Sequence, residues 1–345
     1  MSIEPPPIDP GLRAEINAAR DAMGRRLVLT RNFHRIEDAV VRQFNSLTST
    51  RTAAASWGPG NRPPSKAVVI SGPFRTGKTW LVNAALASLK PIVAGYIEVS
   101  PNPLSVECPS HFEMTGLGRN ILDRLQLLPA RSLGPTETME RVTRRLGIVR
   151  PTQLRIDEFQ RTLHPVKVGP LRLDQERLRI WGQIQLLLDD PYWPTPIILT
   201  GLPEIITVLE QPRMGFLRDR CETVLALASM TPGDTEDVHE LEGGFDQFGD
   251  AVGVRAERTR DDELPERLML ASNYAMGLAF ELTHRAIENA LENRRARFDI
   301  EDFAAVYARK TGAEDAANPF LARDWIRVDP KRLLAKDTNQ KPAGD

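Results

Sequence analysis

The sequence predicts an α/β protein in which a five-stranded parallel sheet is covered by helices and followed by a small C-terminal helical domain. Three observations predict this class. Short apolar segments typical of buried strands alternate with segments of helical spacing between residues 67 and 230. A glycine-rich loop with the form of a phosphate-binding loop joins the first of these strands to the first helix. After residue 230 the strand-like segments stop and only helical patterns follow.

The glycine-rich loop has the form G-x-x-x-x-G-K-T. Its residues are Gly72, Pro73, Phe74, Arg75, Thr76, Gly77, Lys78 and Thr79, and we expect Trp80 to border the same site. A strand is predicted at 68–71 before it and a helix at 79–89 after it. Glycines let backbone N–H groups converge on phosphates, and the start of the helix adds positive potential. An ordinary glycine turn before a helix is the alternative, but the flanking elements favour nucleotide binding.

The remaining elements of the core follow in order. Further strands are predicted at 92–99, 153–156, 197–200 and 223–227, and further helices at 115–128, 174–190 and 203–210. Short apolar strands separated by helices indicate a parallel sheet that is covered on both faces. Arg155 inside the third strand is unusual for that reason, and the sequence pattern offers no explanation for it.

An acidic pair, Asp157-Glu158, ends the third predicted strand, 85 residues after Gly72. An aspartate at this position can hold the coordination shell of Mg²⁺ together with the Thr79 hydroxyl, while Lys78 reaches the β- and γ-phosphates of ATP. A glutamate directly after it can orient or activate an attacking water. The alternative is that the pair only caps the following turn. The phosphate loop upstream favours the catalytic interpretation.

Two further positions are candidates for sensing the γ-phosphate. Thr200 ends the fourth predicted strand, beside the expected nucleotide, although it could instead cap the helix near Pro203. Arg218 and Arg220 precede the fifth strand. An arginine there either stays in a surface ion pair or reaches the nucleotide of a neighbouring subunit as an arginine finger.

Four regions are predicted along the chain. Residues 1–66 form a helical extension and linker, 67–230 the nucleotide-binding core, 231–315 a helical lid and 316–345 a partly disordered tail. Helical spacing is present at 12–48, 238–248, 264–294 and 300–310. The polar residues 336–345 are the part of the tail expected to be disordered.

The net charge is −1, but basic and acidic residues are distributed unevenly along the chain. Residues 1–66 carry ten Lys and Arg against six Asp and Glu, and residues 119–155 carry eight against three. Residues 233–263 carry eleven Asp and Glu against three Lys and Arg. Local basic patches are compatible with nucleic-acid binding, and solvated helix faces would have the same composition. The acidic segment is either a docking surface for a partner or an ordinary solvated part of the lid.

The cysteines and apolar segments predict a cytoplasmic protein. Cys108 and Cys221 offer no disulfide framework, and the N-terminus lacks the basic and apolar regions of a signal peptide. The longest apolar run, 194–209, contains Pro203 and Glu204, so we expect no membrane span. Cys108 and His111 are too few ligands for a zinc site.

Taken together, these motifs resemble those of the AAA+ ATPases, and within them the TniB/TnsC-type ATP-binding proteins of transposons, akin to the phage Mu B protein. The resemblance covers roughly residues 30–320. Besides the phosphate loop, it is carried by Gly95-Tyr96-Ile97-Glu98-Val99-Ser100-Pro101, Leu117-Gly118-Arg119-Asn120-Ile121-Leu122, Ile156-Asp157-Glu158-Phe159-Gln160, Leu199-Thr200-Gly201-Leu202-Pro203-Glu204 and Asn318-Pro319-Phe320.

The resemblance implies an ATP-dependent homo-oligomer, a ring or a helical filament, on duplex DNA. Such an oligomer marks a target and recruits or activates a DDE-type transposase, and related proteins also work with a TniQ-type target-selection partner. It implies that Lys78 and Thr79 bind phosphate and Mg²⁺. It also implies that Asp157 helps to hold the metal and that Glu158 acts on the attacking water. Thr200 is the implied sensor, and the resemblance places Arg220 ahead of Arg218 as the finger.

One departure concerns the lid, because many AAA+ proteins carry a sensor arginine at the start of a lid helix and residues 276–280 contain none. Arg285 lies two turns further on and is a weak substitute. The DNA contacts are expected from Arg119, Arg124, Arg141, Arg144 and Arg145. Two alternative functions stay open at this stage: a regulatory switch that acts on protein partners without DNA, and a secretion or replication motor of the same superfamily.

Overall fold

The computed structural model describes residues 10–57, 60, 62–94, 97–127, 133–165, 170–258 and 262–330. Its contacts divide the chain into two units, which are described one at a time. The α/β unit comprises Arg31–Phe74 and Lys78–Ala228, and the helical unit comprises Met1–Thr30, Arg75–Gly77 and Ser229–Asp345. Residues 336–345, which we expected to be disordered, lie outside the described part of the chain.

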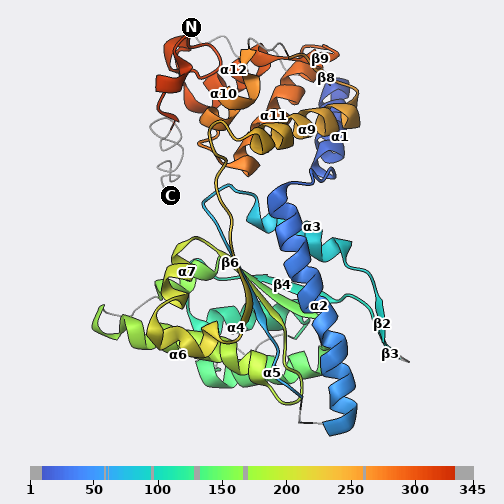
Figure 1. Ribbon diagram of the computed structural model, residues 1–345, viewed down its shortest axis with the longest axis vertical. Coiled ribbons are helices and arrows are strands. Elements are labelled where there is room, and N and C mark those ends of the chain that lie inside the picture. Colours follow the sequence, from blue (N-terminus) through green and yellow to red (C-terminus); the bar gives the residue numbers. More distant parts are fainter. Residues whose placement is uncertain are drawn as a thin grey trace. The chain divides into compact units, whose positions relative to one another are not determined.

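The α/β unit is built on one five-stranded sheet (Figure 1). Its strands are β4 (Pro103–Glu107), β5 (Gln153–Asp157), β6 (Ile197–Gly201), β1 (Ala67–Ser71) and β7 (Cys221–Ala226), in that spatial order. Every neighbouring pair is parallel. All residues of β1, β5 and β6 are buried, as expected for the centre of a parallel sheet with helices on both faces. The predicted fold class is therefore confirmed.

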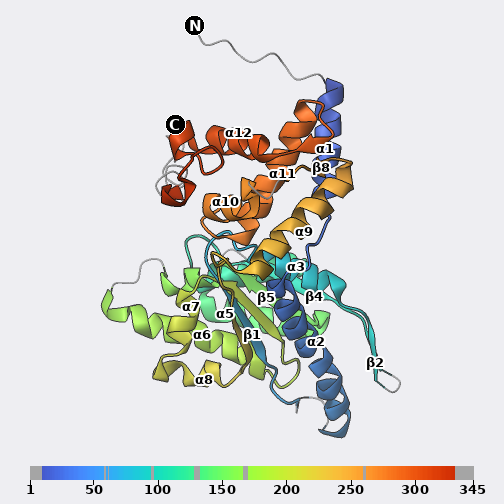
Figure 2. The same ribbon diagram turned by 45° about the horizontal axis from the view of Figure 1, so that its top comes forward.

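The helices of this unit are α2 (Arg31–Trp57), α3 (Lys78–Ser88), α4 (Met114–Arg124), α5 (Pro135–Val149), α6 (Pro170–Asp189), α7 (Glu204–Leu209) and α8 (Gly215–Arg218). Two short 3-10 helices, η1 (Phe159–Leu163) and η2 (Pro212–Met214), lie between them. In both ribbon views α2 lies on one side of the sheet and α6 on the other (Figures 1 and 2). The unit thus has three layers, with the sheet in the middle.

Alternation along the strands assigns side chains to the two faces of the sheet. Leu154 and Ile156 of β5 belong to the apolar cluster that includes residues of α4, α5, α6, α7 and α8. The intervening residues, Gln153, Arg155 and Asp157, therefore lie on the opposite face, where α2 and α3 pack. The polar groups of the site are thus gathered on the face that carries the first helix after the phosphate loop.

The strand prediction for 92–99 is wrong. These residues contain β2 (Ile92–Ala94) and β3 (Ile97–Val99), which pair antiparallel in a separate two-stranded sheet. The fifth core strand is β4, which lies at the edge of the main sheet and has only one buried side chain. An edge strand needs no continuous apolar run, so β4, with Pro103 at its start, lacks the pattern that identifies a central strand.

The helical unit consists of α1 (Pro10–Gly24), α9 (Thr235–Val252), α10 (Leu264–Ala271), α11 (Met276–Glu292) and α12 (Ile300–Thr311). A short parallel pair joins β8 (Arg255–Ala256) to β9 (Arg297–Phe298), and η4 (Asp315–Ala317) and η5 (Trp325–Arg327) follow α12. The helical spacing predicted at 264–294 is divided between α10 and α11, because the left-handed backbone of Asn273 and Tyr274 separates them.

Aromatic side chains form the core of the helical unit. Phe303 lies against Phe245, Phe298 and Phe320, with ring centroids 5.4–6.1 Å apart. Phe320 belongs to the Asn-Pro-Phe segment, and the side-chain nitrogen of Asn318 donates to the Ala304 carbonyl at 2.9 Å. This segment is therefore a packed part of the unit.

Helix α1 packs on α9 and α11 within the same unit. The Arg20 guanidinium pairs with the Glu288 carboxylate of α11 at 2.9 Å, and Met23 is fully buried. The helical spacing predicted at 12–48 is thus divided between α1 in this unit and α2 in the α/β unit. None of the helices in the described ranges combines the length and apolar character needed to cross a membrane.

Candidate nucleotide-binding site

The strand order places the candidate residues at one edge of the sheet. β6 lies between β5 and β1, so the residues that follow these three parallel strands meet at their carboxyl ends. The Gly72 N–H donates to the Gly201 carbonyl at 3.2 Å, which ties the start of the phosphate loop to the end of β6. This edge is where nucleotides bind in open α/β sheets.

The phosphate loop ends where α3 begins, at Lys78. Gly77 has φ of +85°, a backbone conformation that glycine adopts without strain. The Lys78 ammonium donates to the carbonyl oxygens of Gly72 and Pro73 at 2.8 and 2.7 Å. Burial lowers the pKa of Lys78, and the nearby carboxylates of Glu158 and Asp157 oppose that shift. A half-buried cation thus lies inside the loop that was predicted to hold phosphates.

The other loop side chains differ in exposure. Thr76 is buried, Pro73 is half-buried, and Phe74 and Arg75 are exposed. Trp80, on the first turn of α3, is also exposed. Phe74 is 69% accessible although it is a large aromatic residue.

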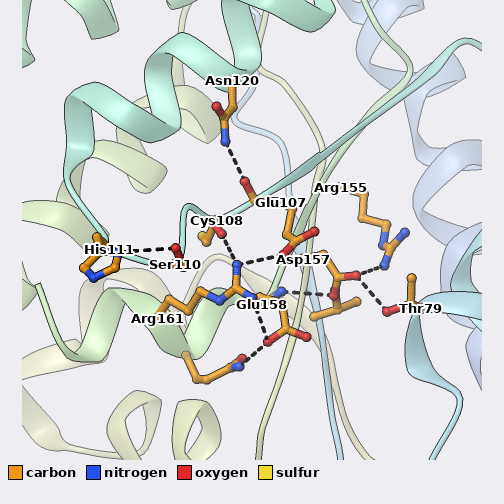
Figure 3. A network of polar contacts seen from close by, with 12 residues as sticks. Thr79, Glu107, Cys108, Ser110, His111, Asn120, Arg155, Asp157, Glu158 and Arg161 are labelled. Atoms are coloured by element: carbon orange, nitrogen blue, oxygen red, sulfur yellow. Dashed lines mark hydrogen bonds and ion pairs between the residues drawn. The ribbon is translucent and has the colours of Figure 1, made fainter. Parts of the chain in front are cut away.

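Asp157 is the centre of the polar network (Figure 3). Its Oδ2 accepts a hydrogen bond from the Thr79 hydroxyl at 2.8 Å and another from the Arg155 guanidinium. Its Oδ1 accepts from the Thr200 hydroxyl and from the Glu158 N–H, the latter at 3.0 Å. Burial raises the pKa of the carboxyl, but the Arg155 charge and these hydrogen bonds outweigh it and lower the pKa. The group is therefore an ionised carboxylate near neutral pH.

The donor set around Asp157 fits Mg²⁺. The Thr79 hydroxyl and the Asp157 carboxylate are hard oxygen ligands 2.8 Å apart, at the end of the phosphate loop. Mg²⁺ is commonly held by one or two protein oxygens, with water and substrate phosphates completing the octahedron. These two residues would hold the metal.

Glu158 lies directly beside this centre and has a left-handed backbone with φ of 56°. The Gln160 amide donates to its carboxylate at 2.6 Å, and the Arg161 guanidinium lies 3.8 Å away. Gln160 also accepts from the Leu202 N–H at 3.2 Å. A Cβ on Gly201 would lie 2.5 Å from the Gln160 side-chain oxygen, so the Gln160 side chain would have to move to admit any other residue.

Sequence reasoning assigned no role to Gln160 or Arg161. Arg161 contacts the Glu107 carboxylate at 2.7 Å and the Cys108 carbonyl, and so joins η1 to the end of β4 (Figure 3). The Asn120 side chain of α4 donates to the Glu107 carbonyl at 3.0 Å. These contacts depend on an edge strand that the sequence pattern did not identify, so no local signal was available to find them.

Thr200 is fully buried, and its hydroxyl donates to Asp157. Helix α7 has Pro203 as its N-cap and no side-chain cap hydrogen bond, so Thr200 does not cap it. The structure therefore places Thr200 beside Asp157. Its role as a sensor stays a prediction.

The candidate finger arginines have different surroundings. The Arg220 guanidinium donates to the Asp189 carboxylate of α6 at 2.7 Å, and both side chains are half-buried. Arg218 is the last residue of α8 and is exposed. In the helical unit, Arg285 pairs with Glu288 at 3.0 Å.

The predicted DNA-contacting arginines lie on α4 and α5, which pack against each other, or at their ends. Arg124, Arg141 and Arg144 are exposed, and Arg119 is half-buried. Arg145 donates to the Leu125 carbonyl at 3.1 Å, so part of its hydrogen-bonding capacity supports the end of α4.

Comparison with known proteins agrees with the fold described above. A family model described as an AAA domain matches residues 64–209. The Aeropyrum pernix ORC2 protein, solved in ADPNP–ADP complexes, is 14% identical with a TM-score of 0.57, and the alignment covers 84% of this chain and 72% of that one. Cdc6p from Pyrobaculum aerophilum is 16% identical with a TM-score of 0.51, covering 83% and 69%. No curated protein matches the sequence.

At these identities the solved structures show a common fold alone. The five-stranded order, the phosphate loop and the AAA-domain match together show that the chain has the AAA+ P-loop fold. The helical C-terminal region is consistent with that fold.

Proposed function

We propose that this chain is a Mg²⁺-dependent ATPase that uses ATP to assemble into an oligomer on duplex DNA. The observation that carries the ATPase proposal is the 2.8 Å hydrogen bond between Thr79 and Asp157. It brings a hydroxyl from the phosphate loop and a carboxylate from a neighbouring strand to one point, where both can serve a metal. The complexes of ORC2 with ADPNP and ADP support nucleotide as the ligand.

Each residue of the site has a distinct part in this proposal. Lys78 exchanges the carbonyls of Gly72 and Pro73 for the phosphates of ATP, and Thr79 and Asp157 hold the metal. Bound Mg²⁺ would neutralise charge that develops on the phosphate oxygens. Glu158 orients the attacking water once its carboxylate is released from Gln160.

Nucleotide binding by Lys78→Ala tests the ATPase proposal. Removing the ammonium should weaken binding of a fluorescent ATP analogue with Mg²⁺ by about tenfold or more, because hydrogen bonds to charged groups contribute about 1.5–3 kcal/mol. Lys90→Ala, which removes an exposed lysine of the same unit, is the matched control. Binding by Lys78→Ala that equals the wild type would contradict the assignment.

The finer proposal is that the oligomer is a transposition regulator, a ring or filament on target DNA that recruits or activates a DDE-type transposase, with a TniQ-type protein as a further partner. The resemblance of the motifs to TniB/TnsC-type proteins supports it. The arginines of α4 and α5 also support it, because a basic surface binds phosphates without reading sequence.

Retention of duplex DNA tests the finer proposal. It is measured with ATP, ADP and a non-hydrolysable analogue at two salt concentrations. We expect binding that requires ATP or the analogue, falls with salt and is independent of sequence. Arg141→Ala/Arg144→Ala should weaken it and lower the salt dependence. Arg172→Ala/Arg213→Ala removes two exposed arginines elsewhere in the unit and serves as the control.

Absence of DNA binding under every condition would contradict the proposed partner. The same result, with nucleotide binding intact, would favour a switch that acts on protein partners.

A further inference from the structure

Arg155 is a charged side chain in the interior of a central strand. It is 3% exposed and lies in β5 between β4 and β6. It precedes Asp157 by two residues, so both side chains lie on the same face of the sheet. Arginine is almost never fully buried unless it is paired, so its position requires a partner.

Arg155 contacts Asp157, the carboxylate proposed to hold the metal (Figure 3). Its Nη2 forms an ion pair with Oδ2 of Asp157, and its Nη1 donates to the Asn83 side chain of α3 at 2.6 Å. Its Nε is buried and has no hydrogen-bond partner among the described residues. A buried donor without a partner destabilises the folded state, so this arrangement costs stability in the interior of the strand.

The same carboxylate oxygen receives two donors. Oδ2 of Asp157 accepts from both Thr79 and Arg155, and Oδ1 accepts from Thr200 and from the Glu158 N–H. A carboxylate offers about four lone-pair positions, so protein donors occupy all of them. A metal that uses Asp157, directly or through water, must displace or share these donors, and Arg155 is the one that carries a positive charge.

We propose that Arg155 is a positioning residue that acts as an internal counter-cation to Asp157 and competes with Mg²⁺ for it. It holds the carboxylate in place when no metal is bound, because a buried charge left without a partner is strongly destabilising. It thereby sets the Mg²⁺ concentration that nucleotide binding requires. This inference rests on the proposed binding of Mg²⁺ with nucleotide.

The first experiment titrates Mg²⁺ at a fixed concentration of a fluorescent, non-hydrolysable ATP analogue and compares wild type with Arg155→Met. The half-saturating Mg²⁺ concentration should fall by about tenfold or more, since a neighbouring arginine lowers the proton affinity of a carboxylate by about one to three logarithmic units and repels Mg²⁺ in the same way. Arg155→Lys keeps the charge and should stay near the wild type. Arg213→Met, which breaks an exposed ion pair with Asp174, should change nothing.

A thermal-unfolding cycle without metal or nucleotide tests the pairing separately. Asp157→Asn leaves Arg155 buried without its partner, so it should melt at a lower temperature than Arg155→Met/Asp157→Asn, in which both charges are gone. The double variant also keeps the inference testable if Arg155→Met alone does not fold. Additive effects of the two substitutions would overturn the pairing.

The outcomes separate this inference from the proposed function. Wild-type protein that binds no nucleotide with Mg²⁺ would overturn the proposed function and the metal competition together. Wild-type binding with an unchanged or increased Mg²⁺ requirement in Arg155→Met would overturn the competition alone. A lower requirement in Arg155→Met with the controls unchanged supports it.

Discussion

Arg218 and Arg220 lie two residues apart but have different surroundings. The resemblance to transposon ATPases places Arg220 first as the residue that reaches a neighbouring subunit. The structure shows Arg220 paired with Asp189 at 2.7 Å, whereas Arg218 is exposed at the end of α8. An intramolecular ion pair must break before the Arg220 guanidinium can serve another subunit, so we propose Arg218 as the finger in its place.

The prediction is that Arg218→Ala lowers the steady-state ATP hydrolysis rate by about 10³-fold, the size expected for an arginine finger. Arg220→Ala should mainly lower thermal stability, by about 1 kcal/mol or less, because its ion pair is partly exposed. Hydrolysis is measured at several protein concentrations with equal amounts of each variant.

Mixing the Arg218→Ala and Lys78→Ala variants provides the control for this experiment. Subunits with Arg218→Ala still bind nucleotide, and subunits with Lys78→Ala still offer Arg218, so a mixture should regain activity that neither variant has alone. Loss of hydrolysis in Arg220→Ala, with normal hydrolysis in Arg218→Ala, would reverse the assignment.

Helix α2 is attached to the sheet by a buried glutamine. The Gln43 amide donates to the Lys66 and Ile197 carbonyls at 2.9 and 3.0 Å, and Gln153 of β5 donates to the Gln43 oxygen at 3.1 Å. Gln153 also donates to the Val40 carbonyl of α2. These bonds join the two buried glutamine side chains to each other and to the backbone between helix and sheet, which satisfies polar atoms that would otherwise be buried without partners.

Gln43→Leu should therefore reduce the free energy of unfolding by about 1–3 kcal/mol, the cost of removing the hydrogen bonds of a buried polar side chain. Denaturant unfolding followed by circular dichroism measures it. Arg42→Leu changes an exposed neighbour on the same helix and should stay within about 0.5 kcal/mol of the wild type. Equal stability of Gln43→Leu and wild type would show that these hydrogen bonds contribute nothing.

The elements differ in how well local sequence identifies them. The loop Gly72–Thr79 and the pair Asp157-Glu158 are recognisable because their chemistry needs fixed residue types next to buried apolar strands. The edge strand β4 is not, since exposed positions remove the apolar run. Residues 92–99 have that run and form a separate hairpin instead.

Partnerships across the sheet are a second limit of sequence reasoning. Arg155 is a charge in a buried strand, and its contact with Asn83 depends on which face of the sheet α3 covers. The hydrogen bond that Gln160 accepts from the Leu202 N–H joins residues 42 positions apart in the chain. Such distant pairs leave no spacing that a single sequence displays.

At the scale of the whole molecule, the proposal joins a nucleotide site to an assembly on DNA. The network around Asp157 would bind ATP in one subunit, and an arginine of the next subunit would contact the γ-phosphate. ATP would then stabilise the subunit interface, and slow hydrolysis would release it. The uneven charge supports two surfaces with different partners. Basic side chains on α4 and α5 would face DNA, and the eleven acidic residues in 233–263 would form the other surface.

The central claim is that this site hydrolyses ATP through Glu158. The most direct test measures nucleotide binding and single-turnover hydrolysis in parallel for wild type and Glu158→Gln. We predict unchanged binding and hydrolysis that is slower by about 10²-fold or more, because the amide cannot activate water. DNA-bound oligomers formed with ATP should persist in the variant. Hydrolysis by Glu158→Gln at the wild-type rate would contradict the account.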